Sequence, residues 1–218
     1  MRAPFDEKLD LLNRRLLQMA SLVVEAIHKA LKAVEERDLA LAEDVIASDH
    51  KINRLMLEIE GESIETIALQ QPVGRDLRRV ITILKIADNL ERIGDHAASI
   101  AKAYRRMHEA TFVRPVPREL REMGTIAEEM IQGSIEAYVE RDANRALEIA
   151  ARDDQLDALH KKVLSELVQR MSEENASLDT CAQLLFIVRS LERVGDYVTN
   201  VCEWIAYLET GEFRELNP

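Results

Sequence analysis

The chain has 218 residues, a formal net charge of −11, 7 glycines and 5 prolines. Such an acidic chain is a poor general binder of nucleic acid or anionic lipid, and no apolar run approaches the roughly 20 residues of a membrane-spanning helix. Many Ala, Leu, Glu, Ile and Arg residues with few glycines and aromatic residues favour an all-α protein of long helices. We expect a cytoplasmic protein without a signal peptide.

Three helices are predicted in the first half, where apolar residues recur three and four apart. They cover about residues 5–37, 39–67 and 73–107. Asp38 is suited to cap the second helix. The segment QQPVG at 70–74 predicts a turn in which Pro72 takes a first helical position.

Residues 111–117 contain two prolines and leave the helical pattern, which predicts an interdomain linker. The plan then repeats, with helices expected over about 118–140, 142–170 and 178–207. Cys181 and Cys202 lie on the last of these helices, about 30 Å apart at the usual helical rise. That separation is beyond disulfide reach, so we expect both to be reduced core residues.

A six-residue motif occurs twice, as LERIGD at 90–95 and LERVGD at 191–196, an offset of 101 residues. Upstream, the pair at 37–38 matches the pair at 141–142, both Arg-Asp, at an offset of 104. Self-similarity of this kind indicates an internal duplication. The sequence therefore predicts six long helices in two tandem three-helix bundles, with domains 1–110 and 118–218 joined by the linker 111–117.

Both copies of the motif place a glutamate on a stripe that we expect to be buried. In the first copy the spacings of four and three are typical of a seam that faces a partner helix, and the stripe comprises Val80, Leu84, Ala87, Glu91, Gly94, Ala98 and Ala101. Glu192 holds the matching position in the second copy. Asp95 and Asp196 follow the glutamates by one helical turn. A buried carboxylate is paired, protonated or metal-bound.

Further oxygen ligands lie on the second helix of each half, Asp49 with Asn53 and Asp153 with Asp157. If these helices pack antiparallel to the motif helices, pairs of oxygen ligands face each other, which suits Mg, Ca, Mn or Fe, with Zn also possible. Spacing alone leaves the register open. The candidate metal ligands are Asp49, Asn53, Glu91, Asp95, Asp153, Asp157, Glu192 and Asp196.

Other interpretations of the charged residues stay open. Acidic residues four apart are common on solvated helix faces, and Arg92 and Arg193 offer pairing with carboxylates on the next helix. Arg75, Arg78 and Arg79 form a basic cluster that is either a solvated face or a docking point for an acidic partner.

The histidines are weaker candidates. Glu25 and His28 have the spacing of a di-iron helix, but the second half has no counterpart. His160 has a place on a stripe or its flank, and His96 is expected outside the first ligand sphere. No nucleophile–base set can be argued, so we expect no enzymatic activity.

The segments 88–96 (DNLERIGDH), 190–196 and 70–78 (QQPVGRDLR) together resemble the PhoU family, and the resemblance covers essentially the whole chain. It implies two three-helix bundles and paired acidic motifs that bind metal ions or metal clusters in some members. The implied cofactors are divalent or trivalent metal ions, namely Fe, Zn, Mn or Mg. Asn53 departs from the acidic pattern, which predicts a weaker first site or one with a different ion.

The resemblance also implies a role. PhoU proteins restrain the phosphate-starvation response by linking the high-affinity phosphate ABC transporter, through its ATPase subunit, to a membrane sensor histidine kinase. We therefore expect a cytoplasmic regulator of phosphate uptake, a homodimer that meets the membrane only through protein partners. Two alternatives are kept: a di-metal carboxylate oxidase of helical-bundle type, which needs His ligands on both seams, and a metal-free helical adaptor.

Overall fold

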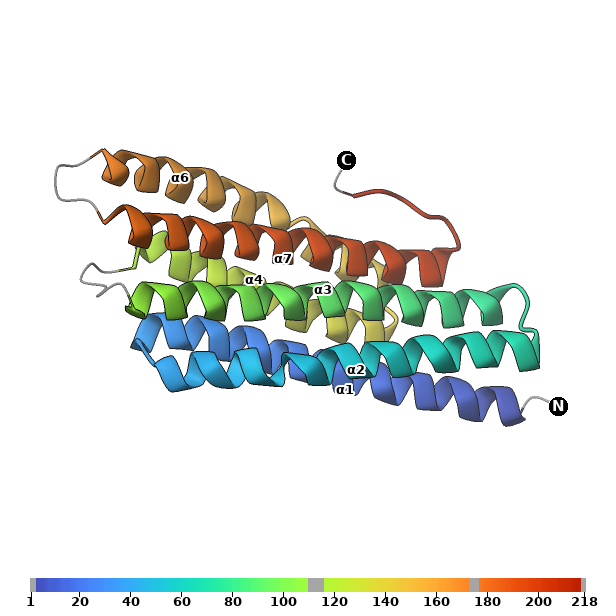
Figure 1. Cartoon of the computed structure of the whole chain (residues 1–218). Helices are drawn as coiled ribbons and strands as arrows, with labels where there is room; N and C mark the ends of the chain where they lie inside the picture. The colour runs from blue at the N-terminus through green and yellow to red at the C-terminus, as the bar shows by residue number, and fades with distance from the viewer. Residues whose placement is uncertain (1–2, 110–115, 173–176, 217–218) are drawn as a thin grey trace.

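The computed structural model describes residues 3–109, 116–172 and 177–216. Every regular element in these ranges is an α-helix, which confirms the predicted fold class (Figure 1). Five of the six predicted helices are continuous, and the fifth is divided into two. The helices are α1 (Ala3–Glu36), α2 (Leu39–Gln70), α3 (Arg75–Glu109), α4 (Arg118–Glu140), α5 (Ala143–Ala150), α6 (Asp153–Met171) and α7 (Leu178–Thr210).

The prediction of one continuous helix over 142–170 is wrong. α5 ends at Ala150, a turn at Ala151 and Arg152 follows, and α6 begins at Asp153. In that turn the Arg152 N–H donates to the Ile149 carbonyl at 3.0 Å, which closes a tighter loop than an α-helical turn. Asp153 and Asp154 then occupy the first turn of α6, where the positive end of the helix dipole favours carboxylates.

The duplicated Arg-Asp pair forms the same turn in both halves. Arg37 and Arg141 have left-handed backbones, with φ of 61° and 56°. Asp38 then caps α2 by accepting a hydrogen bond from the Leu41 N–H at 3.0 Å, and Asp142 caps α5 by accepting from two backbone N–H groups at 3.0 Å. The predicted cap at Asp38 is therefore confirmed, and Asp142 caps the corresponding helix of the second half.

The third helix begins later than Pro72, so the first helical position assigned to that proline is wrong. Gly74 has φ of 58° and cannot continue a right-handed helix, and α3 starts at Arg75. In the second half, the joint expected near 174–175 lies outside the described residues. So does most of the linker predicted at 111–117, and the domain division at 110–118 stays a prediction.

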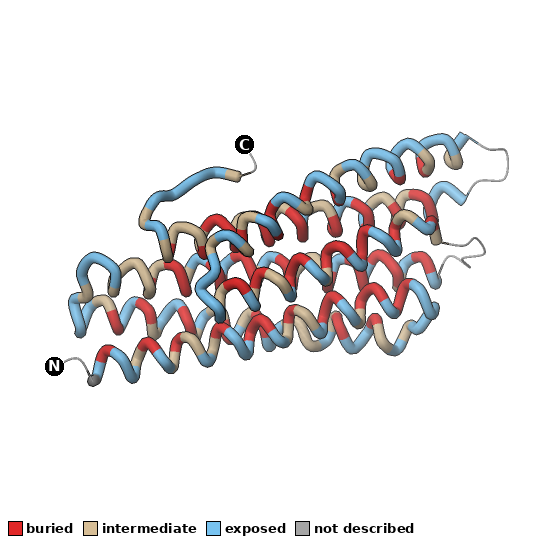
Figure 2. Tube along the Cα trace, turned by 180° about the vertical axis from the view of Figure 1, so that it is seen from behind, coloured by how far each residue is buried: buried red, intermediate tan, exposed pale blue. Residues whose placement is uncertain are grey.

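α3 and α7 form the centre of the molecule and pack along each other (Figure 1). α1 and α2 cover α3, while α4, α5 and α6 cover α7. Buried positions follow stripes along each helix that face this centre (Figure 2), and one cluster of buried apolar side chains runs through both halves. The two motif helices therefore share a core.

α4 is shorter than its counterpart α1, with 23 residues against 34. It begins near the end of α1, where His28 Nδ1 and Glu128 Oε1 lie 2.9 Å apart. Because α4 stops after 23 residues, the first turns of α1 and α3 and the last turn of α7 extend beyond it. None of the described helices combines the length and apolar character that crossing a membrane requires.

Candidate metal centres

The first acidic cluster joins α2 to α3. Burial raises the pKa of Asp49, and the negative charge of Asp95 raises it further. Burial also raises the pKa of Glu91, with Asp95 next in size and Arg92 opposing. Asp49 adds a smaller repulsion to Glu91. These mutual effects place the α2 and α3 acids within electrostatic range of one another.

Two oxygens of this cluster are buried without a hydrogen-bond partner, Asp49 Oδ1 and Asn53 Oδ1. The Asn53 amide donates to the other Asp49 oxygen over a long 3.4 Å. A buried acceptor left without a donor costs about 1–3 kcal/mol. The pair therefore presents two oxygens that a cation would satisfy.

The second acidic cluster joins α6 to α7. Asp153 is 7% exposed, and its pKa is raised to about 7, first by burial and then by the charges of Asp196 and Asp157. Burial and Asp196 likewise raise the pKa of Glu192, against opposing effects of Arg193 and His160. The carboxylates of the second cluster therefore repel one another, as those of the first cluster do.

The two glutamates of the motif are less buried than their stripes. The Glu91 and Glu192 side chains are 22% and 21% exposed, whereas Ala87 and Val188 on the same stripes are buried. The expectation of full burial is therefore wrong for these two residues. Both glutamates are placed at the edge of a buried seam, where water still reaches one side of the carboxylate.

The arginines of the motif pair within their own helix rather than with the next one. Arg92 Nε lies 3.6 Å from Glu91 Oε2, and its guanidinium reaches Asp95 at 3.9 Å. Arg193 makes the same contacts with Glu192 at 3.6 Å and with Asp196 at 3.1 Å. Such half-exposed pairs contribute only about 0–1 kcal/mol each. They offset part of the carboxylate repulsion.

The oxygen donors fit a hard cation in type, because carboxylates and amide carbonyls are the ligands that such ions prefer. Their placement across two helices also fits, and the oxygens Asp49 Oδ1 and Asn53 Oδ1 are buried acceptors without a donor. Among the described residues, however, no three His, Cys, Asp or Glu side chains converge closely enough to hold an ion. Closing a coordination shell requires side-chain rotation.

The glycines of the motif allow close helix packing, as their position on the stripe predicts. A Cβ atom at Gly94 would lie 2.9 Å from Ile52 Cδ1 on α2. At Gly195 the added atom would overlap Asp153 Oδ1 and lie 2.6 Å from Leu156 Cδ2. In the second half the glycine thus makes room for an acidic side chain of the cluster.

The three weaker histidine candidates have different surroundings. His28 contacts Glu128 on α4, so the Glu25–His28 pair is not directed at α3. His96 lies with its ring 5.7 Å from that of Tyr197 on α7, and burial lowers its pKa. His160 is near enough to Glu192 to lower the pKa of that glutamate.

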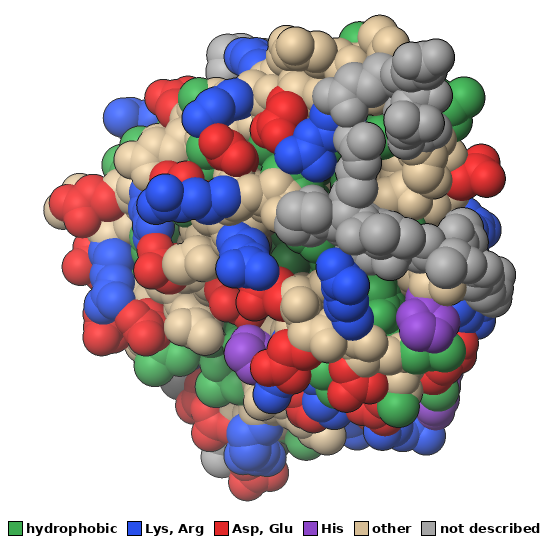
Figure 3. Space-filling view, turned by 90° about the vertical axis from the view of Figure 1, so that its left-hand side faces the viewer, with side chains coloured by type: hydrophobic (Ala, Val, Ile, Leu, Met, Phe, Trp, Pro, Cys, Tyr) green, Lys and Arg blue, Asp and Glu red, His purple; other side chains and the backbone are tan. Residues whose placement is uncertain are grey.

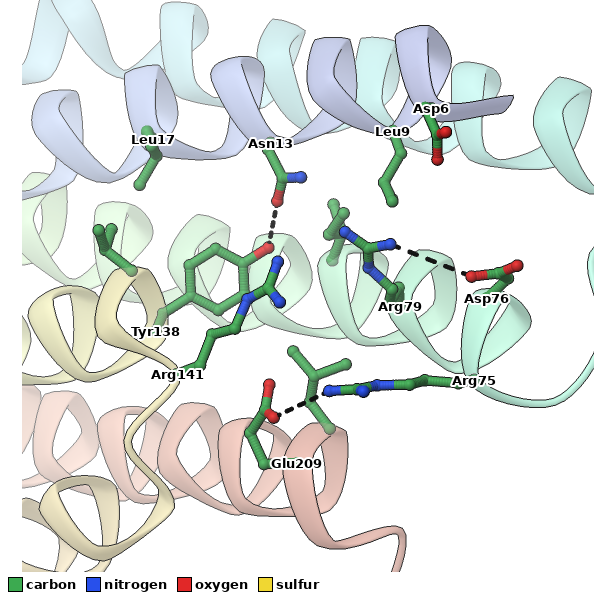
Figure 4. A pocket seen from close by; sticks show the side chains of 13 residues that line it. Asp6, Leu9, Asn13, Leu17, Arg75, Asp76, Arg79, Tyr138, Arg141 and Glu209 are labelled. Carbon is green, nitrogen blue, oxygen red and sulfur yellow. Dashed lines mark hydrogen bonds and ion pairs between the residues drawn. The ribbon is translucent and has the colours of Figure 1, made fainter. Parts of the chain in front are cut away.

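A cavity that sequence reasoning missed lies beyond the end of α4 and has a volume of about 450 Å³ (Figure 4). It is lined by side chains from α1, α3, α4 and α7, including Asn13, Arg79, Tyr138 and Arg141. The basic cluster at 75–79, noted in the sequence, supplies two of the residues that line this cavity, Arg75 and Arg79. The other residues are far apart in sequence, and only the packing of four helices assembles them.

The fold and the two clusters define a class of protein: a duplicated helical bundle whose repeated motif places acidic side chains between neighbouring helices. The chain belongs to the PhoU family. The family model described as "PhoU domain" matches residues 16–104 and again residues 120–205. The two matches fall on the two predicted repeats.

Similar proteins match over nearly the whole chain. A "Phosphate-specific transport system accessory protein PhoU homolog" from Clostridium acetobutylicum is 41% identical, covering 99% of both chains. The crystal structure of the phosphate transport system regulatory protein PhoU from Streptococcus pneumoniae has a TM-score of 0.89 at 35% identity, covering 97% of this chain and 99% of that one. PhoU from Pseudomonas aeruginosa has a TM-score of 0.92 at 33% identity, covering 95% and 100%.

Proposed function

We propose that this protein is a non-enzymatic regulator of phosphate uptake that acts as an accessory of a phosphate transport system. The observation that carries the proposal is the 41% identity, over 99% of both chains, to a protein named as such an accessory. The near-complete coverage of both chains and the two matches of the PhoU domain in this chain support transfer of the role. The expected partners are the ATPase subunit of a phosphate ABC transporter and a sensor histidine kinase.

The surface supports protein partners rather than nucleic acid. On the end face where α6 ends and α7 begins, Lys and Arg side chains are interspersed with Asp and Glu (Figure 3). Nucleic-acid binding proteins instead carry a continuous basic patch. With a net charge of −11, the protein would reach a membrane through its partners. We place it in the cytoplasm as a homodimer.

The acidic clusters are part of this proposal. Asp49, Asn53, Glu91 and Asp95 would hold one cation between α2 and α3, and Asp153, Asp157, Glu192 and Asp196 a second between α6 and α7. A bound Fe, Zn, Mn or Mg ion would supply positive charge that offsets the carboxylate repulsion. By holding the cation from both sides, the acidic residues would fix the distance between α2 and α3 and between α6 and α7. The support is the buried, unpartnered oxygens of Asp49 and Asn53 and the raised pKa values of the acids in both clusters.

A gene deletion tests the regulatory role in cells. In phosphate-replete medium, the deletion strain should show raised alkaline phosphatase expression and altered phosphate uptake. The wild-type gene should restore both. Unchanged expression and uptake in the deletion strain would contradict the role.

A metal-free adaptor is the second candidate, favoured by the pairing of Arg92 and Arg193 with the motif acids. In that case Glu91→Ala and Glu192→Ala should change stability and leave metal content unchanged. The di-metal oxidase has less support, because His28 contacts Glu128 on α4. Oxygen consumption after Fe(II) loading would be its evidence.

A further inference from the structure

The cavity beyond the end of α4 is lined by both apolar and charged side chains. Leu9, Ile83 and Leu208 line it and are buried. Three guanidinium groups also line the cavity, those of Arg75 and Arg79 from the start of α3 and that of Arg141 just after α4 (Figure 4). We call this cavity the arginine pocket.

Arg79 and Arg141 both lie near one phenol, that of Tyr138. Burial raises the pKa of Tyr138 to about 12, and both guanidinium groups act against that rise. The Tyr138 hydroxyl donates a hydrogen bond to Asn13 Oδ1 on α1 at 2.5 Å. Figure 4 shows both arginine side chains directed into the space beside this hydroxyl. Two positive charges therefore share one polar wall of the pocket.

Three acidic side chains, those of Asp6, Asp76 and Glu209, line the pocket with the three arginines but pair with them unevenly. Arg75 pairs with Glu209 at 3.2 Å, but Arg79 reaches Asp76 only at 4.0 Å. Within residues 3–109, 116–172 and 177–216, no ion pair joins Arg141 to an acidic side chain. The remaining acid, Asp6, is exposed near the start of α1. An arginine has five N–H donors, so Arg79 and Arg141 retain most of theirs for a ligand.

We propose that the arginine pocket binds a phosphate-class oxyanion between the guanidinium groups of Arg79 and Arg141. A guanidinium matches such an anion because its N–H groups donate in pairs to neighbouring oxygens. The adjacent N-terminus of α3 adds a favourable dipole. The volume of about 450 Å³ is in the range of small-molecule sites, so the anion is either free phosphate or the phosphate group of a larger metabolite.

The pocket lies between the two halves of the chain. α1 and α3 come from the first repeat, and α4 and α7 from the second. A bound anion would therefore link Arg79 of one repeat to Arg141 of the other. The ligand chemistry follows from the arginines and does not depend on the proposed regulatory role.

Calorimetric titration of the full chain with inorganic phosphate, sulfate and ATP tests the proposal. EDTA is present throughout, so that anion bound through metal at the acidic clusters does not contribute. We expect saturable binding of phosphate or ATP that weakens about tenfold or more in Arg79→Gln and in Arg141→Gln. Tighter binding of ATP than of phosphate would assign a larger metabolite, and tighter binding of phosphate would assign the free ion.

Arg145→Gln is the matched control, because Arg145 is four residues from Arg141 but pairs with Glu136 and Glu140. It should bind as the wild type does. Thermal melts without anion check that each variant is folded, and Arg141→Lys replaces Arg141→Gln if the latter is not. No saturable binding of the three probes up to about 10 mM, or equal binding in wild type and both folded pocket variants, would overturn the proposal. Because these are binding measurements, their failure is separate from failure of the cellular role.

Discussion

Asp153 Oδ1 lies directly over the α-carbon of Gly195, in the space that a Cβ atom there would occupy. A residue of α6 thus uses the absence of a side chain on α7 to approach the helix closely. The same motif glycine in the first half faces an isoleucine, Ile52. Both repeats therefore use a motif glycine to bring two helices close together. The glycine contacts an apolar side chain in the first repeat and also an acidic one in the second.

Gly195→Ala should destabilise the fold and disturb the second acidic cluster. The added methyl would displace both Asp153 and Leu156, and overpacking of this kind costs about 1–3 kcal/mol. Urea denaturation measures the loss. Gly61→Ala on α2 is the control, because nothing lies within 4 Å of a Cβ there, and helix propensity should make it neutral or stabilising by up to about 1 kcal/mol. Equal stability of Gly195→Ala and the wild type would contradict the packing seen here.

The stability of the protein should depend on pH through Asp153. Its pKa rises from 3.8 to about 7 on folding, so the folded state binds this proton more tightly than the unfolded state does. The resulting stabilisation is complete below the unfolded pKa and is lost as the pH rises through about 7. Relative to Asp153→Asn, the wild type should lose on the order of 2–4 kcal/mol between about pH 4 and pH 8.

Denaturant titrations with EDTA, at several pH values, measure this difference. Asp154→Asn is the control, since Asp154 is exposed on the same turn and its charge is the smallest of the causes that raise the pKa of Asp153, so most of the pH dependence should remain. A divalent ion should reduce the pH dependence, because it competes with the proton for the carboxylates. Parallel pH profiles for the wild type and Asp153→Asn would count against the burial argument.

The cap of the duplicated turn should contribute to stability in both halves. Asp38→Ala and Asp142→Ala each remove an acceptor from the backbone N–H groups that begin the next helix, at a cost of about 1 kcal/mol. The midpoint of urea unfolding measures both, with the exposed Asp10→Ala on α1 as control. A cost near zero for either cap variant would show that its helix start is held by packing alone.

Much of the fold was predictable because helix period, proline position and repetition are local signals. α4 begins and ends at the predicted residues, and the start of α2 follows from the cap at Asp38. The break at 151–152 was not predictable, since alanine and arginine are good helix formers. Register was also out of reach, because spacing identifies the face of Asp49 but not the residue on α3 that it meets.

The candidate site shows the same division. The repeated motif identified Glu91 and Glu192, and their helix partners followed from stripes. Their edge position, at 22% and 21% exposure, depends on how deeply each seam is covered, which periodicity does not report. The arginine pocket exists because α4 is shorter than α1. That Tyr138 and Arg141 line this pocket becomes visible only once α1, α3, α4 and α7 are packed together.

Metal content after loading tests the central claim most directly. The protein is incubated in turn with Mn, Fe, Zn or Mg, freed of loose ions by gel filtration and measured by elemental analysis. The pair Asp49→Asn with Glu91→Gln should lose the metal of the first cluster alone, and Asp153→Asn with Glu192→Gln that of the second alone. Glu128→Gln, which removes a contact between α1 and α4 that involves no residue of either cluster, should keep both. A wild type that retains none of these metals, or cluster variants that retain as much as the wild type, would contradict the claim.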